Sequence, residues 1–227
     1  MKCSVIIPAL NAEKHIGACI DALRAFSSNC EIIVSDGGST DKTLEILRGK
    51  NVNVIFSAQG RGIQLNKGAQ ASTGDIFFFL HADTAVTREV FPAVQKEFQN
   101  EAVQVAKCSV SFDGDSRMLS FYARLAKIDS FWTSFGDQGI IVRRGFFEKM
   151  GGFSDWPLLE DVAFFQKARK LTKIHTLPVR LVTSAERFVR NGMVRQQLFN
   201  AKIILKYLWG VPPARLAREY EGFRSNR

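Results

Sequence analysis

Short apolar runs alternate with amphipathic stretches over the first 110 residues of the chain. The apolar runs predict strands over residues 4–8, 31–35, 53–56 and 75–80. Between them, apolar residues at helical spacing predict helices over residues 12–26, from Thr40 or Asp41 to Leu47, and over 61–71, with Asn11 placed to cap the first. Apolar strands separated by helices indicate βαβ units and therefore a largely parallel sheet.

The second half of the chain has a less regular pattern. Strands are predicted over residues 103–112, 138–142 and 174–182, and helices over 118–127 and 160–171. Residues 187–209 form a long basic amphipathic segment, which Pro212 and Pro213 separate from a short final helix. We therefore expect one α/β domain over residues 1–186, with a basic helical extension over 187–227 packed on it.

Polar side chains gather where the predicted strands of the first half end. They are Asn11 and Glu13 after the first strand, Asp36, Ser39, Thr40 and Asp41 after the second, and His81, Asp83 and Thr84 after the fourth. Ligands of open α/β sheets bind at the carboxyl ends of the strands. Four carboxylates in three such loops exceed what turns require, so this edge of the sheet is the candidate functional site.

Charge is distributed unevenly along the chain. The 227 residues carry a formal net charge of +9, yet residues 1–114 are nearly neutral, and residues 167–227 hold 14 basic and three acidic residues. This asymmetry fits a phosphorylated ligand, a membrane surface or nucleic acid. An aromatic content of 11% excludes a disordered chain, and no apolar run has the length of a membrane span. Four cysteines without a CxxC pair argue against zinc and favour a reducing cytoplasm.

Five segments, in order, resemble family 2 glycosyltransferases, whose fold is the GT-A fold. They begin at Ser4 (SVIIPALNAE), Ser35 (SDGGSTD), Gly60 (GRGIQLNKGA), Phe79 (FLHADT) and Pro157 (PLLED). Together they span residues 4–161. The GRGIQ segment, the HADT variant and the GVPP ending also resemble a narrower subgroup, the glycosyltransferases of arsenosugar biosynthesis.

The resemblance implies an inverting transfer from a nucleoside diphosphate sugar, with UDP-sugars favoured, to a small-molecule or lipid-linked hydroxyl acceptor. The nucleotide-binding residues that it implies are Pro8, Ala9, Glu13, Asp36, Arg61, Gln64 and Asp83. Asp36 would accept from a base N–H, and the Arg61 guanidinium would pair with a phosphate or ribose oxygen. A solvated arginine and a surface glutamine are the competing interpretations of Arg61 and Gln64.

The DXD motif of the family is altered here, because its first acidic position is His81. Asp83 is the expected ligand of Mn²⁺ or Mg²⁺, since such ions bind one or two carboxylates together with substrate phosphates. A neutral imidazole is also capable of ligating Mn²⁺, so His81 is a second candidate. It brings no negative charge, which puts strict metal dependence in doubt.

Asp161 is the expected general base, which takes the proton of the acceptor hydroxyl as the new bond forms. Capping of the helix that follows is the alternative role of Glu160 and Asp161. On the acceptor or sugar side we expect Asp137, Gln138, Trp156, Glu160, Arg187 and Arg190. For the two arginines a solvated helix face is an equal interpretation, and for Trp156 core packing is the commoner role.

Three other functions compete with sugar transfer. A nucleotidyltransferase usually has a glycine- and lysine-rich loop after its first strand, and here that loop, residues 9–13, has neither. Nucleic-acid binding has no recognised signature, so we expect no nucleic-acid partner. The third is a membrane-binding module. Residues 202–209 mix Lys with Ile, Leu, Tyr and Trp, which suits an interfacial helix at the inner face of the membrane. Core or homodimer packing explains the same helix equally well.

Overall fold

The computed structural model describes residues 1–26, 30–112, 136–183 and 192–225. Within these ranges, one eight-stranded sheet has the strand order β3-β2-β1-β4-β7-β6-β8-β5. The strands are β1 (Cys3–Ala9), β2 (Cys30–Asp36), β3 (Asn53–Phe56), β4 (Ile76–Phe79), β5 (Thr84–Val86), β6 (Val105–Phe112), β7 (Ile140–Arg143) and β8 (Ile174–Thr183).

The sheet is mixed and mainly parallel, as the sequence predicts. Strands β3, β2, β1 and β4 run parallel, and β6 pairs in parallel with β8. The antiparallel pairs are those of β7 with β4 and β6, and of β5 with β8. The parallel strands β1 and β2 therefore end side by side, with Ala9 opposite Asp36.

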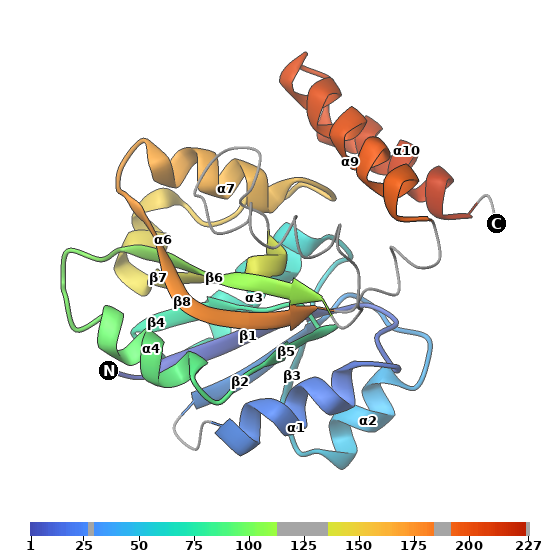
Figure 1. The fold of residues 1–227 in the computed structure, drawn as a ribbon. Coiled ribbons are helices and arrows are strands. Elements are labelled where there is room, and N and C mark those ends of the chain that lie inside the picture. Colours follow the sequence, from blue (N-terminus) through green and yellow to red (C-terminus); the bar gives the residue numbers. More distant parts are fainter. Residues whose placement is uncertain (27–29, 113–135, 184–191, 226–227) are drawn as a thin grey trace.

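Helices cover both faces of the sheet (Figure 1). They are α1 (Ile16–Phe26), α2 (Thr43–Gly49), α3 (Arg61–Ala71), α4 (Val90–Glu97), α6 (Arg144–Met150) and α7 (Glu160–Arg169). Side chains alternate across a strand. Accordingly, Val5 and Ile7 of β1 join the core beneath α1, α2 and α4, whereas Ile6 joins the core beneath α3, α6 and α7.

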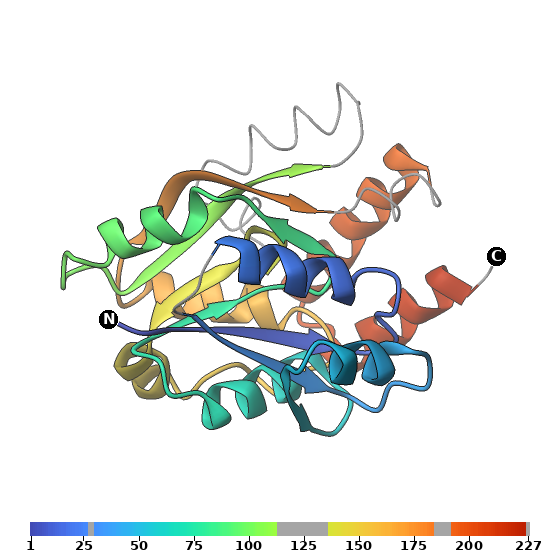
Figure 2. The same cartoon turned by 90° about the horizontal axis from the view of Figure 1, so that it is seen from below.

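The carboxyl-terminal segment forms a helical hairpin of α9 (Met193–Leu208) and α10 (Pro213–Ser225). Figures 1 and 2 place it beyond the end of the sheet toward which β1 points. Ile203 and Leu216 pack there with Leu159 and Val162, and the Tyr207 hydroxyl donates to Gln166 Oε1 of α7 at 3.0 Å. Among the helices in the described ranges, none has both the length and the apolar character needed to cross a bilayer.

Several predicted elements coincide with the structure, and others differ. The predicted ranges 53–56 and 61–71 match β3 and α3. The predicted cap of the first helix is wrong, because α1 begins at Ile16 and the Asn11 side chain instead accepts from Thr40 N at 2.8 Å. Gln138 precedes β7 in a short 3-10 turn (η1, Gly136–Gln138) rather than beginning the strand. Helices α4 and α6 and strand β5 were not predicted, and the predicted helix over 118–127 lies outside the described residues.

Candidate active site

The loops after β1 and β2 are joined by reciprocal hydrogen bonds. Glu13 Oε2 accepts from Lys42 N at 3.0 Å, while Glu13 N donates to Asp41 Oδ2 at 3.1 Å. Asn11 N donates to Ser39 Oγ at 2.9 Å, beside the bond from Thr40 N. The polar residues of these loops therefore hold the two strand ends together. The predicted contact of Glu13 with the nucleotide stays a prediction, and its carboxylate already has this structural role.

Asp36 is fully buried at the end of β2. Its Oδ2 accepts from the backbone N–H groups of Gly38 and Ser39, each at 2.9 Å, and its Oδ1 accepts from Ser39 Oγ at 2.5 Å. Phe56 is the register partner of Asp36 on β3, and it is 66% exposed. The carboxylate is held in one orientation at the strand-end edge, and its contact with a base remains a prediction.

Gln64 fastens α3 to the same strand ends. Its side-chain amide nitrogen donates to Ala9 O at 2.8 Å and to Ser35 O at 3.0 Å, and the residue is 3% exposed. Ala9 O also accepts from Gly37 N at 2.9 Å. Sequence reasoning treated Gln64 as a nucleotide contact or a surface residue. The structure shows a buried side chain that links α3 to the ends of β1 and β2, and Pro8, next to Ala9 in β1, is half-buried.

Arg61 opens α3 directly after Gly60, whose φ of +143° is open only to glycine at little cost. Its Nε lies 3.0 Å from Glu160 Oε1, and its Nη2 lies 2.5 Å from His81 Nε2. Burial lowers the pKa of Arg61, but the charges of Glu160, Asp161 and Asp83 outweigh it, so the pKa is raised. Arg61 therefore stays charged at the centre of a carboxylate-rich site.

His81 accepts a hydrogen bond from Arg61, because a guanidinium has donors only. Nε2 is the nearer of the two ring nitrogens, and the same Nη2 lies 3.4 Å from Nδ1. The lone pair that would ligate a metal through Nε2 is directed at Arg61 instead. The geometry thus disfavours His81 as a metal ligand.

Asp83 follows His81 by two residues and is half-buried at the end of the loop after β4. Among the described residues, no three His, Cys, Asp or Glu side chains lie close enough together to hold a metal ion by themselves. A single carboxylate still fits Mn²⁺ or Mg²⁺, since these ions can take much of their shell from substrate phosphates and water. Asp83 is thus the side chain that would hold such an ion.

Glu160 and Asp161 enter the site from the first turn of α7. Leu159 precedes them with a φ of +66°, a left-handed conformation that is uncommon for a residue with a side chain. Glu160 is fully buried. Its Oε1 is close to Arg61 Nε, but the donor direction is poor, so neither carboxylate oxygen accepts a hydrogen bond from the described residues. Burial, together with the charge of Asp161, raises the pKa of Glu160 to about 7 against the opposing effect of Arg61.

Asp161 is half-buried and faces Gly136. Its Oδ2 accepts from Gly136 N at 2.6 Å, and its Oδ1 accepts from Val162 N at 2.8 Å. A methyl group on Gly136 would lie 2.9 Å from His81 Nε2, 3.0 Å from Asp161 Oδ2 and 3.4 Å from Arg61 Nη2. Because Gly136 has no side chain, those of His81, Asp161 and Arg61 come together at this point. Sequence reasoning missed it, although it stands directly before the singled-out Asp137 and Gln138, which lie in the same turn.

The remaining predicted residues on the acceptor side divide into two groups. Trp156 is half-buried, and its ring meets Tyr207 of α9 edge-on at a centroid distance of 6.1 Å. Arg187 and Arg190 lie outside the described residues. Sequence reasoning also missed Tyr220 of α10, which lies near enough to Arg61 to affect its pKa. The carboxyl-terminal hairpin therefore borders the site.

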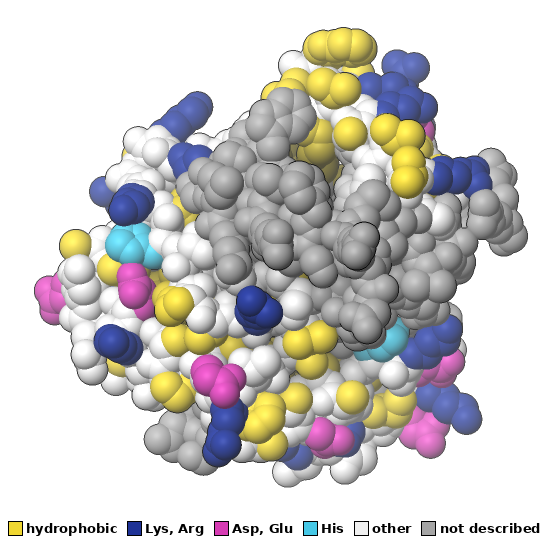
Figure 3. Space-filling model, in the orientation of Figure 1, with side chains coloured by type: hydrophobic (Ala, Val, Ile, Leu, Met, Phe, Trp, Pro, Cys, Tyr) yellow, Lys and Arg dark blue, Asp and Glu magenta, His cyan; other side chains and the backbone are white. Residues whose placement is uncertain are grey.

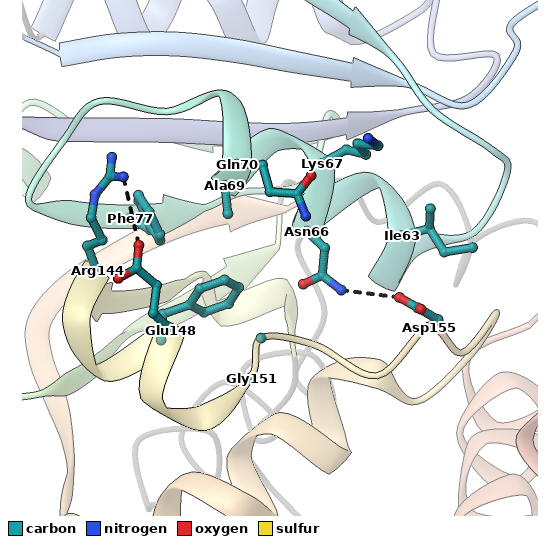
Figure 4. Close-up of a pocket in the computed structure, with 12 residues that line it drawn as sticks. Ile63, Asn66, Lys67, Ala69, Gln70, Phe77, Arg144, Glu148, Gly151 and Asp155 are labelled. Carbon is teal, nitrogen blue, oxygen red and sulfur yellow. Dashed lines mark hydrogen bonds and ion pairs between the residues drawn. The ribbon is translucent and has the colours of Figure 1, made fainter.

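A separate cavity of about 680 Å³ lies between α3 and α6 (Figure 4). Three of its polar side chains already serve the fold. Asn66 donates to Phe153 O at 2.9 Å and to Asp155 Oδ1 at 3.2 Å, while Arg144 donates to the carbonyls of Ser72 and Gly74. The cavity therefore gives no second candidate for the reacting centre.

Comparison with known proteins agrees with this arrangement. The chain matches the family described as Glycosyl transferase family 2 over residues 4–164. A PGL/p-HBAD biosynthesis glycosyltransferase of Mycobacterium bovis is 34% identical over 92 residues, which cover 37% of this chain and 36% of that protein. The match thus spans about a third of the length of this curated relative.

Two solved structures share the fold. One is S. aureus TarS 1–349 in complex with UDP-GlcNAc, with a TM-score of 0.67 and 21% identity over 81% of this chain and 58% of that one. The other is the mannosyltransferase PcManGT of Pyrobaculum calidifontis in complex with GDP-Man and Mn²⁺. Its TM-score is 0.64, with 20% identity over 88% of this chain and 64% of that one.

These likenesses extend over the segments that carry the candidate site. The family match includes the strand-end loops, Arg61, His81, Asp83 and the start of α7. The arsenosugar-type subgroup stays a prediction. The family model matches residues 4–164, which is more than half of this chain, and the fold is the GT-A fold. The chain therefore belongs to glycosyl transferase family 2.

Proposed function

We propose that this protein transfers a sugar from a nucleoside diphosphate sugar, with UDP-sugars favoured, to a hydroxyl acceptor, and that it inverts the anomeric configuration. The observation that carries the proposal is the meeting of Arg61, His81 and Asp161 around Gly136, within the segment that matches the family. One cation and one carboxylate at a single point suit a reaction that expels a diphosphate and removes a proton.

Asp161 is the proposed general base. In one displacement, the acceptor oxygen bonds to the anomeric carbon, the bond from that carbon to the diphosphate oxygen breaks, and the hydroxyl proton moves to Asp161. The backbone bond from Gly136 N holds Oδ2 in a fixed direction, and the N–H of Val162 does the same for Oδ1. General-base catalysis of this kind supplies a rate factor of about 10²–10⁴.

Arg61 is the proposed partner of the departing diphosphate. A guanidinium has five N–H donors, more than the contacts to Glu160 and His81 use. A Mn²⁺ or Mg²⁺ ion held by Asp83 and the donor phosphates would neutralise further charge on the leaving group. The mannosyltransferase with GDP-Man and Mn²⁺ supports this assignment by analogy of fold.

Asp36, beside the exposed ring of Phe56, is the proposed contact of the nucleotide base. Pro8 and Ala9 would line the same nucleotide site. Asp137 and Gln138 follow Gly136 directly, which supports a place for them near the sugar or acceptor. The acceptor is a small molecule, of which an arsenosugar precursor is one example, or a lipid-linked alcohol. The four free thiols fit a reducing cytoplasm.

A nucleotide-sugar panel tests this function. The protein would be incubated with UDP-glucose, UDP-galactose, UDP-GlcNAc and GDP-mannose, with and without Mn²⁺, in the presence of polyhydroxyl acceptors or polyprenyl phosphate vesicles. Release of the nucleoside diphosphate from one donor is expected, and NMR of the product would give the anomeric configuration. Release from none of the donors, together with no binding of UDP or GDP, would contradict the proposal.

A further inference from the structure

Helix α9 carries a stripe of exposed apolar side chains along its outer face. Its members are Val194 (59% exposed), Leu198 (67%), Leu205 (43%), Leu208 (46%) and Trp209 (81%), which follows the last helical residue. The first four lie four, seven and three residues apart, close to whole helical turns, and this keeps them on one side of the helix. Figure 3 shows hydrophobic side chains gathered over this part of the molecule, with Lys and Arg side chains beside them.

The inner face of the same helix accounts for its packing. Ile203 and Ile204 are buried with Leu216 and with residues at the start of α7, and the Tyr207 hydroxyl bonds to Gln166. The outer stripe is therefore not needed to hold the hairpin together. Contiguous exposed apolar surface of this kind marks a binding surface.

A row of cations borders the stripe on one side. Arg195, Lys202 and Lys206 lie at successive intervals along α9, next to the apolar positions on the helix circumference. Arg195 and Lys202 lie over the rings of Phe223 and Phe199, and both lysines pair with Glu219 of α10. The sequence has no acidic residue from Arg187 to Arg218, a stretch with seven Lys and Arg. The apolar stripe is thus bordered by three cations, two of which share the single carboxylate of Glu219.

We propose that the outer face of α9 docks this protein on an anionic lipid bilayer. The leucines and Trp209 would enter the boundary between headgroups and acyl chains, while the cations meet anionic headgroups. An antiparallel second copy of the chain is a poorer occupant, since that pairing brings the two cation rows to the same side of the contact. A bilayer offers apolar depth and the opposite charge at once.

Docking here would also orient the candidate site. The hairpin lies beyond the end of the sheet toward which β1 points, which is the edge that carries Asp36 and Arg61 (Figures 1 and 2). Tyr220 of the same hairpin lies close enough to Arg61 to act on its pKa. The reacting edge would thus be held near the membrane surface. The docking itself does not depend on the proposed transfer reaction.

Vesicle flotation tests the proposal directly. The full chain would be floated with vesicles of phosphatidylcholine alone and of phosphatidylcholine with 30% phosphatidylglycerol, a probe composition of about the anionic content that attracts basic segments. The variants are the pair Leu198→Gln with Leu205→Gln and, as a matched control, Leu171→Gln, which changes an exposed leucine outside the hairpin. Thermal unfolding of each variant would check that it is folded.

We expect the wild type and Leu171→Gln to float with the anionic vesicles and to be released by high salt. The double variant should bind at least tenfold more weakly. Absence of binding to anionic vesicles would overturn the proposal, and so would equal binding of the double variant. If light scattering instead found a dimer that the double variant dissolves, a second copy would be the occupant and the proposal would be wrong.

Discussion

Arg61 Nη2 lies 2.5 Å from His81 Nε2, at the position where the resemblance to the family predicts the first acid of a DXD motif. Because arginine only donates, a ring nitrogen of His81 is the acceptor in this contact. The cluster therefore places a cation near Asp83, whose charge helps to raise the pKa of Arg61. The positive charge at this point comes from the Arg61 side chain.

Restoring an acid at position 81 should strengthen metal binding. His81→Asp adds a second carboxylate near Asp83, so we expect Mn²⁺ affinity in the presence of UDP to rise about tenfold or more. Calorimetric titration of Mn²⁺ into the UDP-saturated protein would measure it. His81→Asn is the control, since it adds no charge. Unchanged Mn²⁺ affinity in His81→Asp would show that position 81 does not face the metal site.

Arg61→Lys should weaken UDP binding while keeping the charge. A lysine has no planar fork, so it cannot hold Glu160, His81 and a phosphate at once, and we expect a loss of about 10–100-fold. Arg24→Lys is a matched control, because Arg24 bonds only a surface carbonyl, that of Asn51, in the described contacts. Equal UDP affinity of Arg61→Lys and the wild type would remove Arg61 from the diphosphate site.

Glu160 should make the protein less stable as the pH rises. Its pKa is about 7 in the folded state against about 4.5 for a solvent-exposed Glu, so the folded chain keeps a proton that the unfolded chain loses between these values. The free energy of unfolding therefore falls as the pH rises from about 4.5 to 7, by an amount on the order of 1–3 kcal/mol. Urea denaturation at several pH values would measure this fall.

Glu160→Gln should flatten that part of the pH profile, because no carboxyl remains to titrate there. Glu148→Gln is the control, since the Glu148 side chain is 62% exposed and should leave the profile unchanged. If Glu160→Gln and the wild type lost stability in parallel between pH 4.5 and 7, burial of Glu160 would not be the cause.

Gly136→Ala should disturb the site more than the fold. The added methyl group would press on His81 Nε2 and Asp161 Oδ2, both polar side-chain atoms that can shift by a few tenths of an ångström. We expect kcat to fall at least tenfold with little change in Tm. Gly145→Ala is the matched control, since its methyl group would meet no atom within 4 Å. Wild-type kcat in Gly136→Ala would show that the reacting groups do not meet there.

Hydrophobic periodicity predicted the centre of the parallel half of the sheet well, because β1 and β4 are largely buried and read as apolar runs. Helix α3 was found over its full length for a related reason, since Leu65 and Ala69 recur on its buried face. Short elements such as β5, with three residues, leave too brief a pattern to detect. Asn11 was misassigned because its side chain bonds across to Thr40, a contact 29 residues away that no local signal shows.

Family motifs located Arg61, Asp83 and Asp161, but not how they are held. Gln64 reads as a polar helix residue, and only the fold shows that it spans the carbonyls of Ala9 and Ser35. The proximity of Tyr220 to Arg61 likewise depends on tertiary packing, because 159 residues separate the two along the chain. Such contacts depend on how distant elements pack.

Asp161 offers the most direct test of the central claim. With the donor and acceptor that the panel identifies, Asp161→Asn should lose about 10²–10⁴ in the rate of transfer, since an amide cannot take the hydroxyl proton. UDP affinity, measured by calorimetry on the same preparation, should stay within a few fold of the wild type. Transfer at the wild-type rate by Asp161→Asn would contradict the account.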